Sequence, residues 1–331
     1  MICPIPRARR ILPLRRKKDL PFVIPKSAIL CYNVMYTKGG VPMLQRAYVE
    51  ITNICNLRCD FCPGTRRPLR AMRVSEFERI ARELRPYTRH IYLHVMGEPL
   101  LHPELDKILD SCCALDFRVH LTTNGVLLPD RLDLLLAAPA LYRLNISLHS
   151  YEANHVQQTL ESYVRDCCRC AAALAARRLE GEDRPVTCVL RLWNRGGRDT
   201  LNDRIAAVLE DCTGRPLHQL ERDARGNRRL LPHVCIEAAD RFHWPGDPAY
   251  DGPDAQFCYG LRRQVAVLCD GTVVPCCLDG EGRLPLGDLL HQSMEDILQG
   301  SRAQRIIRGF DCRRPAEELC RRCGYAARFN K

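Results

Sequence analysis

The sequence predicts an α/β fold built on parallel strands, and two observations on its 331 residues support this prediction. Short apolar runs rich in Val, Ile and Leu alternate with helical segments, which is typical of successive βα units. Six such runs are expected to form strands: 47–52, 90–95, 118–122, 144–149, 187–193 and 233–238. These units form either a doubly wound sheet or a barrel, and in both folds the ligand sites lie at the carboxyl ends of the strands.

Local signals predict the individual elements. The run AYVEIT at 47–52 is typical of a strand, and Ser75 is expected to begin the first helix because Glu78 completes a capping box. Residues 1–45 carry several prolines and a run of basic side chains, so we expect an N-terminal extension before the sheet domain of residues 46–250. Further helices are expected at 103–115, 130–138, 157–177 and 201–211.

The pattern changes after residue 251. The runs 265–269 and 272–275 flank the dipeptide Asp270-Gly271, which is typical of a β-hairpin with a tight turn. We therefore expect a small cysteine-rich C-terminal domain over residues 251–331. Its expected helices are 294–299 and 302–308.

The composition restricts the class of protein. No run of eighteen apolar residues is present, and the N-terminus lacks the apolar stretch of a secretory signal, so we expect no membrane span and a cytoplasmic location. Six lysines among 50 basic residues leave 44 arginines, and the net charge is +11. A basic cluster within residues 7–18 leaves a nucleic-acid partner possible, although a solvated arm is the favoured interpretation.

Cysteine is abundant, with 20 residues, and three cysteines follow the first expected strand closely. Cys55, Cys59 and Cys62 have the spacing CxxxCxxC. Thiolates are the usual ligands of iron–sulfur clusters, and three of them leave one iron of a four-iron cluster open to a small molecule. A structural zinc site is the alternative, but it generally needs four ligands and no fourth cysteine is near in the sequence.

This spacing, Phe61 before the last cysteine and the βα alternation resemble the radical S-adenosylmethionine (SAM) superfamily. The resemblance implies a partial (β/α)6 barrel of parallel strands. It also implies a 4Fe–4S cluster, at which SAM is cleaved reductively to a 5′-deoxyadenosyl radical that abstracts hydrogen from a substrate. The implied partners are a peptide, protein or small-molecule substrate and an electron donor such as a flavodoxin or a ferredoxin.

The same resemblance implies which residues contact SAM, because the family uses successive strand ends for this purpose. A carboxylate after the second strand can accept from the methionyl ammonium, and an arginine is a natural partner of the SAM carboxylate. The residues at these positions are Phe61, Gly97, Glu98, Thr123, Asn124, Ser147 and Arg191.

The C-terminal cysteines resemble a SPASM-type domain. Cys258 is followed after twelve residues by Gly271 and after four more by Cys276, and the tail contains Cys320 and Cys323. The resemblance implies one auxiliary 4Fe–4S cluster with these four cysteines as ligands. The adjacent Cys277 competes with Cys276, which matches the spacing to the glycine better. A zinc ribbon with the same four thiols is the alternative.

Other cysteines are interpreted as packing residues. They are Cys112, Cys113, Cys167, Cys168 and Cys170 in expected helices, together with Cys269 and Cys312. Three functions remain open: a radical enzyme that modifies a peptide, protein or small molecule, a radical enzyme that acts on RNA, and a non-catalytic iron–sulfur carrier or scaffold.

Overall fold

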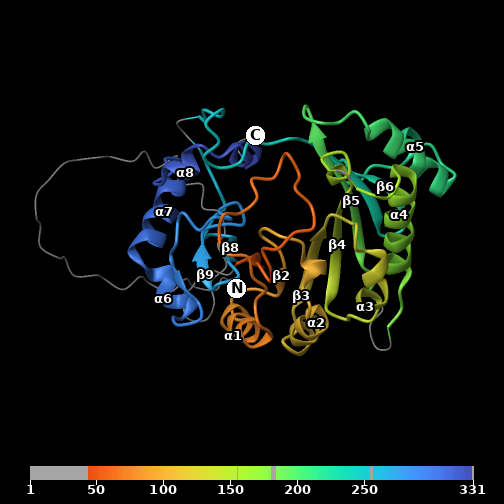
Figure 1. The fold of residues 1–331 in the computed structure, drawn as a ribbon. Helices are drawn as coiled ribbons and strands as arrows, with labels where there is room; N and C mark the ends of the chain where they lie inside the picture. Colours follow the sequence, from red (N-terminus) through yellow and green to blue (C-terminus); the bar gives the residue numbers. More distant parts are fainter. Residues whose placement is uncertain (1–43, 155, 180–183, 254–255, 330–331) are drawn as a thin grey trace, which may run out of the picture. The chain divides into compact units, whose positions relative to one another are not determined.

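The computed structural model describes residues 44–154, 156–179, 184–253 and 256–329. In this part of the chain, ten strands form one sheet in the order β10-β9-β8-β1-β2-β3-β4-β5-β7-β6 (Figure 1). The strands are β1 Arg46–Val49, β2 His90–Tyr92, β3 Arg118–Thr123, β4 Leu141–Ser147, β5 Thr187–Arg195, β6 Arg228–Leu231, β7 Val234–Asp240, β8 Gln264–Val267, β9 Thr272–Val274 and β10 Gly287–Asp288. The α-helices are α1 Val74–Leu84, α2 Leu105–Ala114, α3 Leu132–Leu136, α4 Leu160–Ala176, α5 Asn202–Thr213, α6 Met294–Gln299, α7 Ser301–Asp311 and α8 Glu318–Arg321.

Six strands, β1 to β5 and β7, are parallel neighbours, which confirms the six strands expected from the sequence. They lie in the order in which they occur along the chain, without the reversal of a doubly wound sheet. The strand order therefore selects the partial barrel. β8 extends the parallel set on the other side of β1. Among the described strands, β6, β9 and β10 are antiparallel to their neighbours.

The sheet curves around a cavity of about 660 Å³. Side chains of six neighbouring strands can line the same cavity only if the sheet is curved, because the strands of a flat sheet point their side chains in parallel directions. In Figure 1, helices α1 to α5 lie along the outer side of β1 to β7, whereas α6 and α7 lie beside β9. Each of the six parallel strands contributes a side chain to the cavity wall. These side chains are Tyr48 (β1), Tyr92 (β2), His120 (β3), Arg143 (β4), Arg191 (β5) and Glu237 (β7).

Helix α4 shows how the cysteines of the sheet domain are used. The hydroxyl of Thr159 accepts from the N–H of Ser162 at 3.3 Å and caps the helix. Cys167, Cys168 and Cys170 are buried in the core between α4 and its neighbours. Burial raises the pKa of all three thiols, which keeps them neutral. Their interpretation as packing residues is confirmed.

The start of α1 differs from the sequence-based expectation. The helix begins at Val74 rather than at Ser75, and Glu78 is not its capping residue. The carboxylate of Glu76 instead accepts from the backbone N–H of Arg73 at 2.9 Å and from the Arg73 guanidinium at 2.8 Å. The expected capping box was therefore wrong. Arg73 is the N-cap residue, and the carboxylate of Glu76 accepts from its backbone N–H in the role that was expected for Glu78.

The C-terminal hairpin is present, but its turn is longer than expected. The turn runs from Leu268 to Gly271, where the N–H of Gly271 donates to the carbonyl of Leu268 at 2.9 Å. Gly271 has a φ of +92°, which favours glycine. The packing roles of Cys112 and Cys269 are confirmed by their burial. Cys113 and Cys312 are exposed, and their interpretation as packing residues was wrong.

The structure bears on the expected N-terminal extension and on the expected absence of a membrane span only in part. The basic cluster within residues 7–18 and nearly all of the expected extension 1–45 lie outside the described residues. No helix in the described part of the chain is long and apolar enough to cross a membrane.

Candidate active site and cysteine clusters

Three cysteines lie on the loop that follows β1. Cys55 is exposed, and Cys59 and Cys62 are partly exposed. The side-chain amide of Asn154 donates to the sulfur of Cys59 at 3.1 Å, and the N–H of Leu57 lies 3.5 Å from the sulfur of Cys55. These N–H donors favour the thiolates that bind iron, but they act against burial, which raises the pKa of both thiols, that of Cys59 to about 11.

In the described residues the three thiols are not grouped around one point. Within the described residues, no three His, Cys, Asp or Glu side chains are placed to share one ion. A structural zinc ion draws four ligands around one point. A four-iron cluster instead distributes its thiolates over several irons. Three thiolate donors therefore fit a four-iron cluster better than a structural zinc ion, which needs a fourth ligand.

Distant parts of the chain hold the cysteine loop in place. The side-chain amide of Asn124, after β3, donates to the side-chain oxygen of Asn56 at 2.8 Å. The indole N–H of Trp244, after β7, donates to the carbonyl of Phe61 at 2.7 Å. The loop thus depends on strand ends that are far away in the sequence.

The segment after β2 passes close beneath the loop. Gly97 has a φ of +74°, and a Cβ atom there would lie 2.4 Å from the carbonyl oxygen of Thr52. The buried carboxylate of Glu98 accepts from the N–H groups of Leu100 at 3.1 Å and Asn124 at 2.8 Å. Burial raises the pKa of Glu98 to about 7, although these N–H donors act in the opposite direction. Glu98 therefore joins the ends of β2 and β3.

The structure brings only part of the predicted SAM-contact set to one cavity. Phe61, Ser147 and Arg191 line the large cavity. The guanidinium of Arg191 donates to the carboxylate of Glu237 at 3.0 Å, and the Phe61 ring packs against His149 with centroids 4.8 Å apart. The predicted residues that do not line this cavity are Gly97, Glu98, Thr123 and Asn124.

Sequence reasoning missed a group of polar side chains deeper in the same cavity. They come from β1, β2, β3 and β4 and the residues next to them, and burial lowers the pKa of two histidines among them, His94 to about 3 and His120 to about 2. The sequence does carry a signal for this group, because a polar residue stands at every second position of otherwise apolar strands, and alternate residues of a strand face the same side of the sheet. The group is Arg46, His90, His94, His120 and Arg143.

The four cysteines expected in the auxiliary site line a second, smaller cavity. Burial raises the pKa of Cys258 to about 12, and the neighbouring thiols add to the effect of burial at Cys276. The thiols therefore lie close enough to interact. Cys277 instead lines the large cavity, where its side chain is hydrogen-bonded to Tyr48. The second cavity is lined by Cys258, Cys276, Cys320 and Cys323, with Gly260, Leu284 and Phe310 among its other residues.

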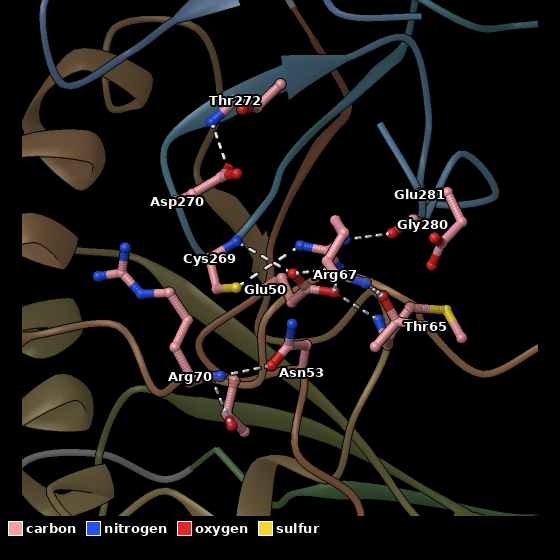
Figure 2. Close-up of polar contacts among 12 residues, drawn as sticks. Glu50, Asn53, Thr65, Arg67, Arg70, Cys269, Asp270, Thr272, Gly280 and Glu281 are labelled. Carbon is pink, nitrogen blue, oxygen red and sulfur yellow. Dashed lines mark hydrogen bonds and ion pairs between the residues drawn. The ribbon is translucent and has the colours of Figure 1, made fainter. Parts of the chain in front are cut away.

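A buried carboxylate after β1 connects the two cysteine regions (Figure 2). Glu50 is fully buried and accepts two hydrogen bonds from the Arg67 guanidinium at 2.7 and 2.8 Å. It also accepts from the N–H groups of Met96 at 3.1 Å and Cys269 at 3.0 Å. Arg67 in turn donates to the carbonyl of Gly280 at 2.7 Å. Glu50 therefore links the chain after the cysteine triad to the C-terminal hairpin.

Comparisons with known proteins match the two regions to two families. A profile of the radical SAM superfamily matches residues 49–184, and a profile of the SPASM iron–sulfur cluster-binding domain matches residues 258–324. These ranges contain the cysteine triad and the four auxiliary cysteines, respectively.

Proteins with similar sequences include GTP 3′,8-cyclases. The protein from Microcystis aeruginosa is 25% identical over 312 residues, which are 80% of this chain and 91% of that protein. The protein from Aquifex aeolicus is 32% identical over 127 residues, which are 35% of this chain and 38% of that protein. The Aquifex aeolicus protein therefore has the higher identity of the two, but the match spans little more than a third of its length.

Two solved structures share the fold. SuiB of Streptococcus suis bound to S-adenosylmethionine has a TM-score of 0.55 at 15% identity and covers 88% of this chain and 75% of its own. BtrN in complex with AdoMet and 2-DOIA has a TM-score of 0.51 at 16% identity and covers 86% of this chain and 94% of its own. The partial barrel expected from the resemblance is confirmed. The chain is a member of the radical SAM superfamily with a C-terminal SPASM domain, and it is an enzyme that uses S-adenosylmethionine and iron–sulfur clusters.

Proposed function

We propose that the enzyme cleaves SAM reductively and uses the 5′-deoxyadenosyl radical to abstract hydrogen from a small molecule bound inside the barrel. The observation that carries this proposal is the cavity of about 660 Å³, whose wall includes Phe61 of the cysteine loop. Its volume lies in the range of small-ligand sites. The names of the GTP 3′,8-cyclase relatives favour a small molecule over a peptide or protein.

The cysteine triad is assigned to the 4Fe–4S cluster that binds SAM. Cys55, Cys59 and Cys62 would hold the cluster, which would supply the electron that breaks a carbon–sulfur bond of the sulfonium. The N–H groups that face two of these sulfurs partly offset the burial that raises the pKa of both thiols.

The SAM-contact assignments fall into two classes. Ser147 and Arg191 line the cavity and are assigned to the ribose hydroxyls and the carboxylate. The ion pair with Glu237 holds the Arg191 guanidinium in place. Glu98 and Asn124 position the strand ends beside the loop, and the Glu98 carboxylate keeps lone pairs that can accept from the methionyl ammonium. The full assigned set is Phe61, Gly97, Glu98, Thr123, Asn124, Ser147 and Arg191.

The second cavity is assigned to one auxiliary 4Fe–4S cluster with Cys258, Cys276, Cys320 and Cys323 as ligands. Four protein ligands leave no iron open to a substrate, so electron transfer or an architectural role follows. The position of Cys277 in the other cavity supports Cys276 as the ligand. A flavodoxin or ferredoxin is assigned as the external electron donor.

Domain boundaries and location complete the proposal. We assign residues 46–250 to the radical SAM barrel, residues 251–331 to the SPASM domain and residues 1–45 to an N-terminal extension. All cysteines in the described part of the chain are free thiols, which supports a reducing compartment such as the cytoplasm.

The test is the anaerobically reconstituted full-length protein with dithionite and SAM. We expect about eight irons per chain, as two four-iron clusters require, and 5′-deoxyadenosine in the product mixture. A reconstituted protein that holds its iron but forms no 5′-deoxyadenosine would contradict the proposed function. About four irons per chain would remove the auxiliary cluster and leave the SAM site standing.

A further inference from the structure

The large cavity carries far more positive than negative charge. Its arginines are Arg46, Arg143, Arg191, Arg225, Arg241 and Arg328, and Glu237 is the acidic residue among its described lining residues. Among the described residues that line the cavity, there is one ion pair. It joins the guanidinium of Arg191 to the carboxylate of Glu237 at 3.0 Å. Uncompensated positive charges in a partly buried space are costly, so this charge distribution favours an anionic ligand.

The unpaired charge gathers around His120, which is 5% exposed. The pKa of His120 is lowered to about 2, first by burial and then by its electrostatic interactions with His90, Arg143, His94 and Arg46. Each of these groups lines the same cavity. Among these groups Arg46 and Arg143 carry the permanent positive charge, because the pKa of His90 and of His94 is lowered.

Two histidines that line this space have ring nitrogens without a hydrogen-bond partner in the described chain. The ring of His120 stacks on Tyr92 with centroids 4.1 Å apart, which sets its orientation. The Nδ1 atom of His90 lies 2.9 Å from the Nε2 atom of His120. When His90 donates in this contact, Nδ1 of neutral His120 carries the proton. The Nδ1 atoms of His120 and His94 are buried and have no hydrogen-bond partner within the described chain.

We propose that this end of the cavity binds a phosphate group, so that the small-molecule substrate of the proposed function is phosphorylated. Arg46, His94, His120 and Arg143 belong to four neighbouring strand segments and approach one space from different sides. A tetrahedral dianion with several oxygens satisfies such a set better than a carboxylate with two oxygens. The inference rests on the proposed function for the radical chemistry.

The phosphate site lies well below the SAM end of the barrel. Tyr92, His120 and Arg143 are paired on neighbouring strands, and Ser147 is paired with Arg191 four residues farther along β4. At about 3.3 Å per residue the two levels are about 13 Å apart. A substrate anchored by its phosphate at the lower level therefore extends toward the radical site.

Binding of inorganic phosphate and pyrophosphate to the anaerobically reconstituted full chain tests the inference. We expect saturable binding at one site per chain by isothermal titration calorimetry at low ionic strength, with succinate as the dicarboxylate comparison. Arg143→Gln should weaken phosphate binding by about tenfold, because a charge-assisted hydrogen bond is lost. Arg143→Lys keeps the charge without the planar fork and should weaken binding less.

Arg79→Gln is the matched control, since Arg79 is exposed on α1 and does not line the cavity. We expect this variant to bind phosphate as the unaltered protein does. The inference is overturned if the unaltered protein shows no saturable phosphate binding, if succinate binds more tightly than phosphate, or if both glutamine variants lose the same affinity. The unaltered protein decides the first two outcomes without any variant.

The same preparation separates this inference from the proposed function. A protein that forms 5′-deoxyadenosine but binds no phosphate overturns the phosphate site alone. A protein that binds phosphate but forms no 5′-deoxyadenosine overturns the proposed radical chemistry and supports the anion site.

Discussion

The cysteine triad lies on a loop beside a cavity of about 660 Å³, whereas the four auxiliary cysteines line a smaller cavity of their own. The triad loop is held by side chains such as Asn154 and Trp244 from distant segments, and Cys55 is exposed. Around the auxiliary thiols, apolar residues such as Leu284 and Phe310 complete the wall.

This difference separates two uses of the same ligand chemistry. A site with three thiols next to an open cavity leaves room for a ligand that reacts. A site with four enclosed thiols satisfies its metal centre with protein alone. We therefore expect the triad to control activity and the auxiliary set to control stability.

The largest expected effect is on activity. Replacing Cys55, Cys59 and Cys62 together with alanine should remove about four irons per chain and abolish 5′-deoxyadenosine formation. Iron analysis and chromatography of the products measure both. Cys113→Ala, at an exposed cysteine of α2, is the control. Persistent SAM cleavage in the triple variant would contradict the assignment of the reactive cluster.

The auxiliary set is expected to act mainly through stability. Cys258→Ala with Cys320→Ala should remove about four irons and lower the free energy of unfolding by several kcal/mol, because metal binding stabilises the folded state. Urea unfolding under anaerobic conditions measures this change. Cys277→Ala should keep its iron, since Cys277 lines the other cavity. Iron loss in that variant, with none in Cys276→Ala, would reverse the ligand assignment.

The link between the two regions is expected to be nearly as important for folding. Glu50→Ala leaves the Arg67 guanidinium without its buried partner and should cost about 3–5 kcal/mol of unfolding free energy. Glu78→Ala removes an exposed helix pair with Arg82 and should cost at most about 0.5 kcal/mol. Equal effects in the two variants would show that the regions fold without this connection.

The smallest expected effect concerns the backbone beneath the triad loop. Gly97→Ala should cost about 2–4 kcal/mol, because its Cβ would meet the carbonyl oxygen of Thr52 at 2.4 Å in a left-handed conformation. Gly214→Ala, which has a φ of +65° and no atom within 4 Å of its Cβ, should cost about 1–2 kcal/mol. Thermal unfolding measures the loss of stability in both variants. Equal losses would contradict the prediction, because they would mean that the backbone moves to relieve the contact between the new Cβ and Thr52.

Much of the fold was predictable because its signals are local. The strands that became β2, β3 and β5 were each expected within a few residues of their observed bounds, since β-branched and apolar runs report burial directly. The spacing of Cys55, Cys59 and Cys62 likewise predicted the chemistry of the first loop. The capping box at Ser75 failed because an arginine pair of Glu76 competes with it.

The sequence by itself determined the ligand types, the order of the strands along the chain and the presence of two cysteine regions. The alternation of strands and helices left a barrel and a doubly wound sheet both open, and the strand order in the tertiary structure selects the barrel that the resemblance implied. Tertiary structure alone decided that Cys276 and Cys277 face different cavities. It also placed His120 among the charges of Arg46 and Arg143. The physical reason is that curvature brings residues of distant strands to one space, and no local pattern records which side chains meet there.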